Sequence, residues 1–322
     1  MSLSPSIDVT YVVDQLCVGE IHRTEQVYRV PGGKGFNVAR AAHALAGDVV
    51  ATGVLGGDAG AWMVQALART GMRILPVAGN QPTRTCVSVA DASTGTLTEF
   101  YEPAPRIEPR AWANLVASVA RLCEERPSWV SLSGSLPPGP VPEALVDLMR
   151  AAQDAGAKVA VDTHSTALAA AVGAGPELIK VNVREAAALL GTGSGIGDRS
   201  DVAVGDALGL ARALLDASGR TELSIVTAGP DGAVAASRDG AVVRARLAAV
   251  GKFPVGSGDS FLGGLLTALS AEPDDLDGAL RLAMAAGAAN AMTPGAGVLD
   301  PDRVTELVPR VEIEHLSVDA TR

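Results

Sequence analysis

An acidic residue, Asp259, stands between three small residues and an apolar segment with helical spacing that extends from Phe261 to Leu269. The small residues, Gly256, Ser257 and Gly258, leave the backbone N–H groups at the start of the predicted helix open to an anion. A carboxylate at the same place can accept a proton from an alcohol. The pattern therefore predicts an anion hole beside a base, as phosphoryl transfer to a hydroxyl requires. A capped turn with no chemical role also explains these residues.

A second glycine-rich segment, Pro31-Gly-Gly-Lys-Gly-Phe-Asn37, precedes an alanine-rich helical pattern from Val38 to Leu45. It presents Lys34 and Asn37 at a helix N-terminus, which suits a ligand with hydroxyls or a phosphate. Arg84 begins a later pair of alternating strands and is a candidate for an anion on the substrate. The alternatives are a glycine-rich turn with a solvated lysine, and an ordinary surface arginine.

Two further groups of residues suit a nucleotide and its metal ion. Asn182 and Glu185 lie three residues apart, where a predicted strand meets a helix, and could hold a hydrated Mg²⁺. The same pair is also a capping box, which needs no ligand. Thr227, Gly229 and Gly232 follow another strand and could line a nucleotide's phosphates, or they form a tight turn.

The composition limits the possible partners. Of the 322 residues, 26 are basic and 36 are acidic, which gives a net charge of −10, and no stripe of Lys and Arg could neutralise a nucleic-acid backbone. No run of about 18 apolar residues predicts a membrane span, and no N-terminal signal segment is recognised. Cys17, Cys86 and Cys123 are too scattered for a disulfide framework or a zinc site, so a reducing cytoplasm is expected.

Hydrophobic periodicity predicts strands and helices in alternation over most of the chain, and hence an α/β fold with a mostly parallel central sheet flanked by helices. Strand ends carry the functional loops in such a sheet. We expect one domain over residues 1–322. The strands expected in its sheet lie near residues 49–55, 129–134, 158–161, 178–182 and 223–236.

Four β-rich pieces, near residues 9–13, 26–30, 83–90 and 96–101, have little apolar mass to bury by themselves. We expect them to form a small four-stranded sheet that lies over the site as a lid, with strands from about 9–30 and 83–104. A second subunit would cover an exposed face of that sheet, which predicts a homodimer. A helix of small residues from 280 to 292 predicts a flat slot for an adenine base.

Motifs in four places together indicate a family. The segments from Pro31 to Asn37, Lys180 to Glu185, Thr227 to Gly232 and Pro254 to Asp259 have the order and about the spacing found in ribokinase-like PfkB carbohydrate kinases. The chain most resembles the branch that contains 1-phosphofructokinase and tagatose-6-phosphate kinase. This resemblance covers residues 4–308 and implies a ribokinase-like fold and ATP-dependent phosphorylation of a hydroxyl on a phosphorylated ketohexose. Three more segments carry the likeness to that branch: Ser4-Pro-Ser-Ile-Asp8, Thr83-Arg84 and Ser133-Gly-Ser-Leu-Pro-Pro138.

The resemblance implies a role for each matching position. Asp259 is expected to be the base, and the backbone of Gly256, Ser257 and Gly258 the anion hole. Asn182 and Glu185 are expected to hold Mg²⁺, through water. The residues expected to bind the sugar phosphate are Asp8, Gly32, Gly33, Lys34, Asn37 and Arg84, with Lys34 and Arg84 on its phosphate. The residues expected to bind ATP are Lys180, Thr227, Gly229, Gly232, Ser257, Gly258 and Asn290, the last on the adenine side.

Three positions depart from the family's usual residues: Ser4 replaces an asparagine, Val181 a proline and Phe253 a small polar residue. The aromatic ring of Phe253 is expected to affect nucleotide affinity or the choice of donor. A kinase for an unphosphorylated sugar or a nucleoside, and a non-catalytic sugar-phosphate sensor, are the rival interpretations. A nicotinamide-dependent oxidoreductase is disfavoured, because no Gly-x-Gly-x-x-Gly fingerprint follows a first strand. The motifs fit fructose 1-phosphate, fructose 6-phosphate and tagatose 6-phosphate alike.

Overall fold

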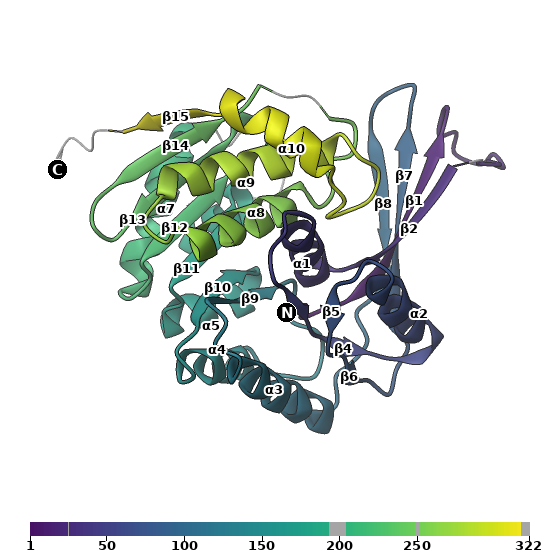
Figure 1. Ribbon diagram of the computed structural model, residues 1–322. Coiled ribbons are helices and arrows are strands. Elements are labelled where there is room, and N and C mark those ends of the chain that lie inside the picture. The colour runs from purple at the N-terminus through teal and green to yellow at the C-terminus, as the bar shows by residue number, and fades with distance from the viewer. Residues whose placement is uncertain (25, 193–203, 249–250, 317–322) are drawn as a thin grey trace.

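A large α/β body carries a smaller sheet at one side in the computed structural model of the chain (Figure 1). The structure describes residues 1–24, 26–192, 204–248 and 251–316. Helices lie on both faces of a seven-stranded sheet, and a separate four-stranded sheet projects from the body. The predicted α/β fold with an appended small sheet is therefore confirmed.

The central sheet is mixed. Its strands are β9 (Trp129–Ser133), β10 (Lys158–Asp162), β11 (Leu178–Asn182), β12 (Leu223–Thr227), β13 (Ala233–Ser237), β14 (Val242–Arg246) and β15 (Glu312–His315). They lie in the order β15-β14-β13-β12-β11-β10-β9. Pairings from β9 to β12 are parallel, whereas those from β12 to β15 are antiparallel. The expected parallel arrangement thus holds for half of the sheet, because short turns after β12 and β13 bring the chain straight back.

Two sets of helices cover the two faces of this sheet, because successive residues of a strand point to opposite sides. One set is α1 (Lys34–Ala44), α8 (Ser257–Ala271), α9 (Leu276–Ala291) and α10 (Pro301–Leu307); the other is α3 (Pro109–Cys123), α4 (Ala144–Gln153), α5 (Ser165–Ala174), α6 (Val183–Leu190) and α7 (Val204–Ser218). Leu178 of β11 packs with the first set, and its neighbours Ile179 and Val181 pack with the second. Burial on both faces explains why the parallel strands are apolar along most of their length. Within the described residues, no helix has the length and apolar character that crossing a bilayer requires.

The small sheet has the strand order β2-β1-β7-β8. Its middle strands, β1 (Ser6–Val13) and β7 (Arg84–Asp91), run parallel, and β2 (Gln26–Gly32) and β8 (Leu97–Tyr101) flank them in antiparallel pairing. Helix α2 (Gly57–Ala68) lies at the base of this sheet in Figure 1. All four strands match the predicted lid pieces. Because β2 leads directly into α1, the sheet is joined to the body at the glycine-rich segment.

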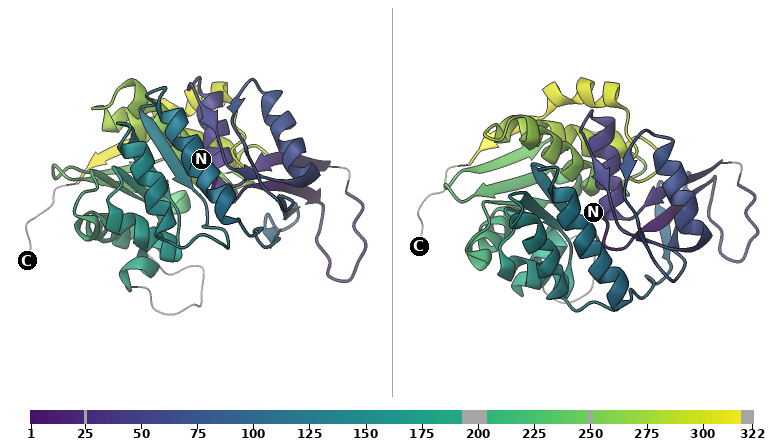
Figure 2. Two further views of the ribbon diagram at one scale, coloured as in Figure 1. Left: turned by 90° about the horizontal axis from the view of Figure 1, so that it is seen from below. Right: turned by 60° about the horizontal axis from the view of Figure 1, so that its bottom comes forward.

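The strand predicted over residues 49–55 is wrong, because the structure has two short strands there. β3 (Val50–Ala51) pairs with β5 (Arg73–Ile74), and β4 (Val54–Leu55) pairs with β6 (Val77–Ala78), in separate two-stranded sheets. Between β3 and β4 the backbone pairs with the start of the chain, since Ser2 N–H donates to Thr52 O at 2.9 Å and Ser2 also bridges to Gly53. Figure 2 shows the N-terminus in the middle of the body from two further sides.

Candidate active site

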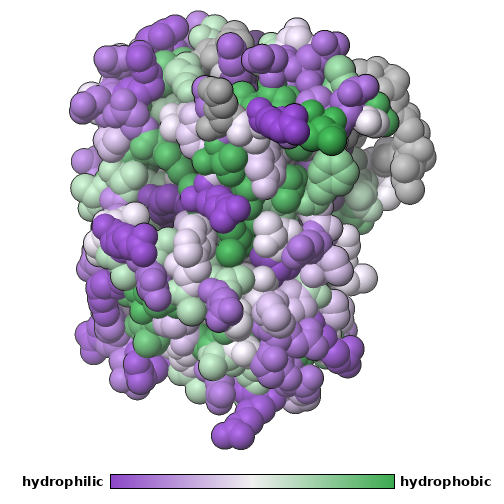
Figure 3. Space-filling model, turned by 90° about the vertical axis from the view of Figure 1, so that its right-hand side faces the viewer, coloured by the Kyte–Doolittle hydropathy of each residue, from purple (hydrophilic) through white to green (hydrophobic). Residues whose placement is uncertain are grey.

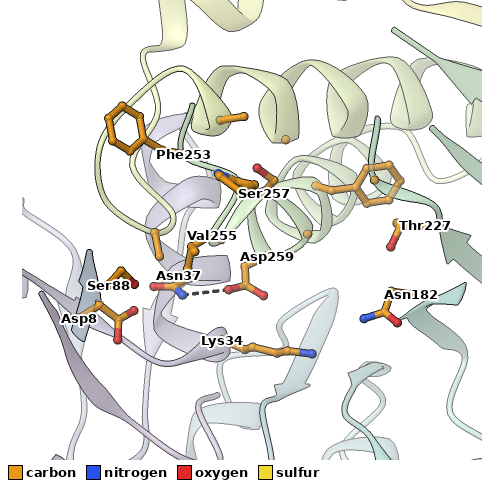
Figure 4. A pocket seen from close by; sticks show the side chains of 18 of the residues that line it. Asp8, Lys34, Asn37, Ser88, Asn182, Thr227, Phe253, Val255, Ser257 and Asp259 are labelled. Carbon is orange, nitrogen blue, oxygen red and sulfur yellow. Dashed lines mark hydrogen bonds between the residues drawn. The ribbon is translucent and has the colours of Figure 1, made fainter. Parts of the chain in front are cut away.

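A cleft of about 680 Å³ lies between the small sheet and the ends of the central strands, and it brings together residues from the whole length of the chain. Asp259 stands near its centre in Figure 4, with Asp8 and Ser88 on one side and Asn182 and Thr227 on the other. The predicted site residues that line it are Asp8, Gly33, Lys34, Asn37, Arg84, Lys180, Asn182, Thr227, Gly229, Gly232, Gly256, Ser257, Gly258 and Asp259.

The anion hole is formed where α8 begins. Gly256 has a left-handed backbone, with φ of 82°, and a Cβ there would lie 2.6 Å from Gly297 N, so glycine is required. The N–H of Ser257 donates to Pro254 O at 3.1 Å and is used within the loop. The N–H groups that remain for an anion are therefore those of the next residues, in the first turn of α8. The predicted anion hole, which included the backbone of Gly256 and Ser257, is therefore reduced to the N–H groups from Gly258 onward.

Lys180 approaches the anion hole from β11. A Cβ on Gly258 would lie 2.9 Å from Lys180 Nζ, so the absence of a side chain at Gly258 makes room for the ammonium group. The side chain of Lys180 is buried, and its ammonium group pairs with the carboxylate of Asp162 at 2.7 Å. A cation and the helix N-terminus thus converge on one place, which is where a transferred phosphoryl group would need stabilisation.

Asp259 is buried, with 7% of its surface exposed, and it lies in the first turn of α8. Burial and the nearby carboxylate of Asp162 raise the pKa of Asp259 to about 6, against the opposing effects of two lysines and a hydrogen bond. That bond comes from Asn37 Nδ2, which donates to Asp259 Oδ2 at 2.8 Å (Figure 4). A carboxylate with a pKa near 6 is ionised at neutral pH and still basic enough to accept a proton from an alcohol.

Asp162, at the end of β10, is a central residue that was missing from the predicted site. It is fully buried and accepts hydrogen bonds from Lys34 Nζ and Lys180 Nζ, both at 2.7 Å. Burial by itself would raise the pKa of Asp162, but the two lysines hold it at about 2. The signal in the sequence was its position directly after a buried strand, where parallel sheets place functional groups.

Lys34 and Arg84 do not come together as expected for two ligands of one phosphate. Lys34 Nζ bonds to Asp162 and, at 3.2 Å, to Glu185 Oε1, and Figure 4 shows its side chain directed toward Asn182. Arg84 instead begins β7 in the small sheet and donates to Glu102 O at 3.1 Å. Lys34 extends across the cleft because its ammonium group binds two acidic side chains, Asp162 and Glu185.

Asn182 and Glu185 form the capping box of α6. Asn182 N–H donates to Glu185 Oε2, and Glu185 N–H donates to Asn182 Oδ1, both at 2.9 Å. The structural explanation of their spacing is therefore correct. In the part of the chain that the structure describes, no group of three His, Cys, Asp or Glu side chains could hold a metal ion by itself.

The wall formed by the small sheet is polar. Asp8 receives a hydrogen bond of 2.6 Å from Ser6 Oγ, and burial raises its pKa against the effects of this bond and of nearby arginines. Gly32 does not line the cleft; a Cβ there would lie 2.0 Å from Asp8 Oδ2, so this glycine makes room for the carboxylate. Thr10 and Ser88 lie on the same wall and were missed, although the alternation of their strands could have indicated them.

The opposite end of the cleft is formed by the turn after β12. Thr227 Oγ1 donates to Val181 O at 3.4 Å, and Gly229 has open space where a Cβ would stand. Gly232 is needed by the fold itself, because its φ is 97° and a Cβ would lie 2.2 Å from Ala245 O. Apolar side chains continue the wall from there: Leu247, Phe261, Met284, Ala288 and Ala291.

Comparison with known proteins decides which family has this arrangement. A model of the pfkB family carbohydrate kinases matches residues 2–303. The chain belongs to the pfkB family of carbohydrate kinases. It is 28% identical to a tagatose-6-phosphate kinase of Staphylococcus epidermidis over 97% of this chain and 98% of that protein. It is also 30% identical to the ATP-dependent 6-phosphofructokinase isozyme 2 of Escherichia coli over 94% of each chain.

Solved structures of pfkB kinases have the same fold. Phosphofructokinase-2 from Escherichia coli, in complex with substrates and products, matches with a TM-score of 0.84 at 29% identity and covers 96% of this chain and 97% of that one. A possible 1-phosphofructokinase from Thermotoga maritima matches with a TM-score of 0.85 at 21% identity over 98% of both chains. The predicted ribokinase-like fold and the prediction of a carbohydrate kinase are both confirmed.

Asn290 of this pfkB kinase does not reach the cleft, which corrects its expected place on the adenine side. Its side chain is fully buried, and its Oδ1 accepts from Gly297 N–H at 2.7 Å and from Ser260 Oγ at 3.0 Å. Its Nδ2 donates to Val255 O at 2.9 Å. Asn290 therefore braces the loop before α8, because every polar atom of its amide is used inside the protein.

The three unusual residues have different surroundings in this pfkB kinase. Val181 is buried in β11 and simply fills the core. Ser4 lines the cleft, and its buried Oγ has no hydrogen-bond partner among the described residues. The ring of Phe253 lies on the Asp8 side of Asp259 in Figure 4, away from Thr227. Phe253 is thus placed to affect the cleft on that side of Asp259 rather than at the turn after β12.

Proposed function

We propose that this pfkB kinase transfers the terminal phosphoryl group of ATP to a hydroxyl of a phosphorylated ketohexose. The observation that carries the proposal is the meeting of Asp259, the start of α8 and Lys180 at the centre of one cleft. The names of its relatives, tagatose-6-phosphate kinase and 6-phosphofructokinase, support an acceptor that already carries a phosphate.

Asp259 is the base in this proposal. As the acceptor oxygen bonds to the terminal phosphorus of ATP and the bond from phosphorus to the ADP oxygen breaks, Asp259 takes the hydroxyl proton. The first-turn N–H groups of α8 and the Lys180 ammonium stabilise the charge on the transferred group. Asn37 holds the carboxylate in place through its 2.8 Å hydrogen bond. A base of this kind contributes about 10²–10⁴-fold to the rate.

The acceptor lies against the small sheet. Arg84 binds its phosphate, because the buried Nε of Arg84 and the Oγ of Ser4 have no partner among the described residues and both residues line the cleft. Asp8 and Asn37, with the backbone of Gly33, hold the sugar hydroxyls. Lys34 and Arg84 were both predicted to bind the acceptor's phosphate, but they have separate roles here, since Lys34 points to the other end of the cleft. We assign Lys34 to the phosphates of ATP.

ATP lies along the end of the cleft formed by the turn after β12. Thr227, Gly229 and Lys180 contact its phosphates, and the apolar wall of α9 accepts its base. Mg²⁺ would be held through water by Asn182 and Glu185, where it would neutralise charge on the phosphates. This donor set fits that ion, because Mg²⁺ at phosphate sites needs few protein ligands and prefers oxygen, and Asn182 and Glu185 supply amide and carboxylate oxygens at the start of α6.

A homodimer through the small sheet would complete the cleft. Tyr28 and Tyr101 are 37% and 58% exposed, and Tyr101 also lines the cleft. Figure 3 shows the side of the molecule that faces right in Figure 1, where hydrophobic residues gather among strongly hydrophilic ones. Covering such residues with a second copy would remove apolar surface from water. We also place the enzyme in the cytoplasm, since its cysteines are free thiols.

An acceptor screen tests this function. ADP release is measured with ATP and Mg²⁺ and with fructose 1-phosphate, fructose 6-phosphate, tagatose 6-phosphate, fructose, ribose and adenosine in turn. We expect turnover with at least one sugar phosphate at a kcat/KM far above that of any unphosphorylated acceptor. Turnover of free sugars or nucleosides alone would contradict the proposal, and binding of sugar phosphates without any ADP release would indicate a sensor.

A further inference from the structure

A guanidinium group binds the asparagine that donates to the proposed base. Arg40 belongs to α1, one turn after Asn37. One amino group of Arg40 donates to Pro31 O at 2.8 Å, and the other donates both to the same oxygen and, at 3.0 Å, to Asn37 Oδ1. Arg40 does not line the cleft and is absent from the predicted site. It reaches the reaction through another side chain.

The hydrogen bond from Arg40 fixes which way the Asn37 amide faces. An asparagine amide has a donor end and an acceptor end, and rotating it by half a turn exchanges them. With Arg40 on Oδ1, the amino group of Asn37 faces Asp259 Oδ2 at 2.8 Å. The rotated amide would set its oxygen against a carboxylate and its amino group against a guanidinium. Arg40 therefore excludes that rotamer.

The positive charge of Arg40 also supports the proposed base, in addition to fixing the Asn37 amide. Burial lowers the pKa of Arg40 to about 10, so it is a cation at neutral pH, and both Asp8 and Asp259 favour its charged form. Because an attraction between two charges is mutual, Arg40 favours the ionised form of both carboxylates. The charged groups that act on the base from the surrounding elements are Lys34 and Arg40 of α1, Asp162 of β10 and Lys180 of β11.

We propose that Arg40 is a positioning residue for phosphoryl transfer, which locks the Asn37 amide onto Asp259 and keeps that carboxylate aligned and anionic. This rests on the proposed role of Asp259 as the base. Through Pro31, the same guanidinium ties the end of β2 to α1. The small sheet and the base are thus held by one side chain.

The test compares Arg40→Met, Arg40→Lys and the control Arg110→Met, which removes an exposed arginine of α3. For Arg40→Met we expect kcat at pH 7 to fall about 10–100-fold, as expected when a reacting group is misplaced, with the KM for ATP within about 3-fold. We expect the acid limb of the kcat/KM profile, which reports the ligand-free enzyme, to move to higher pH. Arg40→Lys should keep the limb near its original pH and lose part of kcat, since lysine keeps the charge but not the two-pronged contact. Arg110→Met should behave as the wild type.

A double-mutant comparison separates positioning from general support of the fold. If Arg40 acts through Asn37, Arg40→Met together with Asn37→Ala should cost no more in kcat than the worse single variant. Costs that multiply, or an acid limb that does not move in Arg40→Met, would overturn the proposal.

A titration of the ligand-free protein keeps this test independent of the reaction. With ¹³C-labelled aspartate, the resonance that disappears in Asp259→Asn reports the base directly. We expect its pKa to rise in Arg40→Met, also in a preparation that turns over no sugar phosphate. An unchanged titration in a folded Arg40→Met protein rejects the role of Arg40. A shifted titration with a fully active Asp259→Asn enzyme would instead reject the proposed base.

Discussion

Lys180 Nζ lies so close to Gly258 that a Cβ on this glycine would be 2.9 Å from it, which couples β11 to the start of α8. The atom that such a Cβ would meet is the end of the Lys180 side chain, which can move. Asp162 binds that ammonium group at 2.7 Å. Gly258→Ala should therefore displace the ammonium from the anion hole without disturbing the backbone of α8, because alanine suits a helix.

We expect Gly258→Ala to lower kcat by about 10²–10³-fold, the loss typical of removing one charge-stabilising donor. Its melting temperature should stay near that of the wild type. Steady-state kinetics and a thermal melt measure both. Gly263→Ala would be a poor control, because a Cβ there lies 2.8 Å from Val38 O. Gly173→Ala, in α5 and with open space where the Cβ would stand, tests the general effect of a lost helical glycine. A fully active Gly258→Ala enzyme would rule out Lys180 as part of the anion hole.

Asp259→Asn should abolish nearly all turnover and yet stabilise the fold. The pKa of Asp259 is raised to about 6, so the folded protein holds this proton more tightly than the unfolded chain, and the carboxylate lowers stability as the pH rises from about 4 to 6. At pH 7 the amide variant avoids that cost. We expect a rise in melting temperature of about 2–4 °C at pH 7 and no rise at pH 4, together with retained sugar-phosphate binding.

Asp162→Asn should shift the pH profile of the enzyme in the direction opposite to Arg40→Met. Asp162 raises the pKa of Asp259, while the lysines that it holds lower it. Loss of the Asp162 charge should therefore move the acid limb of kcat/KM below its wild-type position near pH 6. The variant also leaves two lysines without their shared anion, at a cost of about 3–5 kcal/mol of folding free energy. Kinetics between pH 5 and 8 and chemical denaturation measure the two effects; an acid limb that stays in place would show that Asp162 does not act on the base.

The residues that could be predicted from the sequence were those in local motifs. The start of α8, the glycine-rich segment before α1 and the four strands of the small sheet each depend on neighbours in the chain. Asp162 could not be assigned in this way, because its partner Lys34 lies 128 residues away. The direction of Lys34 and the burial of Asn290 could not be predicted for the same reason, since both depend on contacts between distant elements.

Removal of the Arg84 side chain should discriminate between phosphorylated and free acceptors. Arg84 lines the cleft at the start of β7, and its buried Nε has no partner among the described residues, so a phosphate would supply one. We expect Arg84→Ala to raise the KM for the sugar phosphate by about 10–150-fold, as for a lost charged hydrogen bond of about 1.5–3 kcal/mol. The KM for ATP should change little, because Arg84 lies in the small sheet, away from the turn after β12. Arg29→Ala, on β2 of the same sheet, is the matched control, since Arg29 is exposed and absent from the cleft lining. An equal rise in both KM values would mean that Arg84 supports the cleft as a whole and does not bind the acceptor's phosphate.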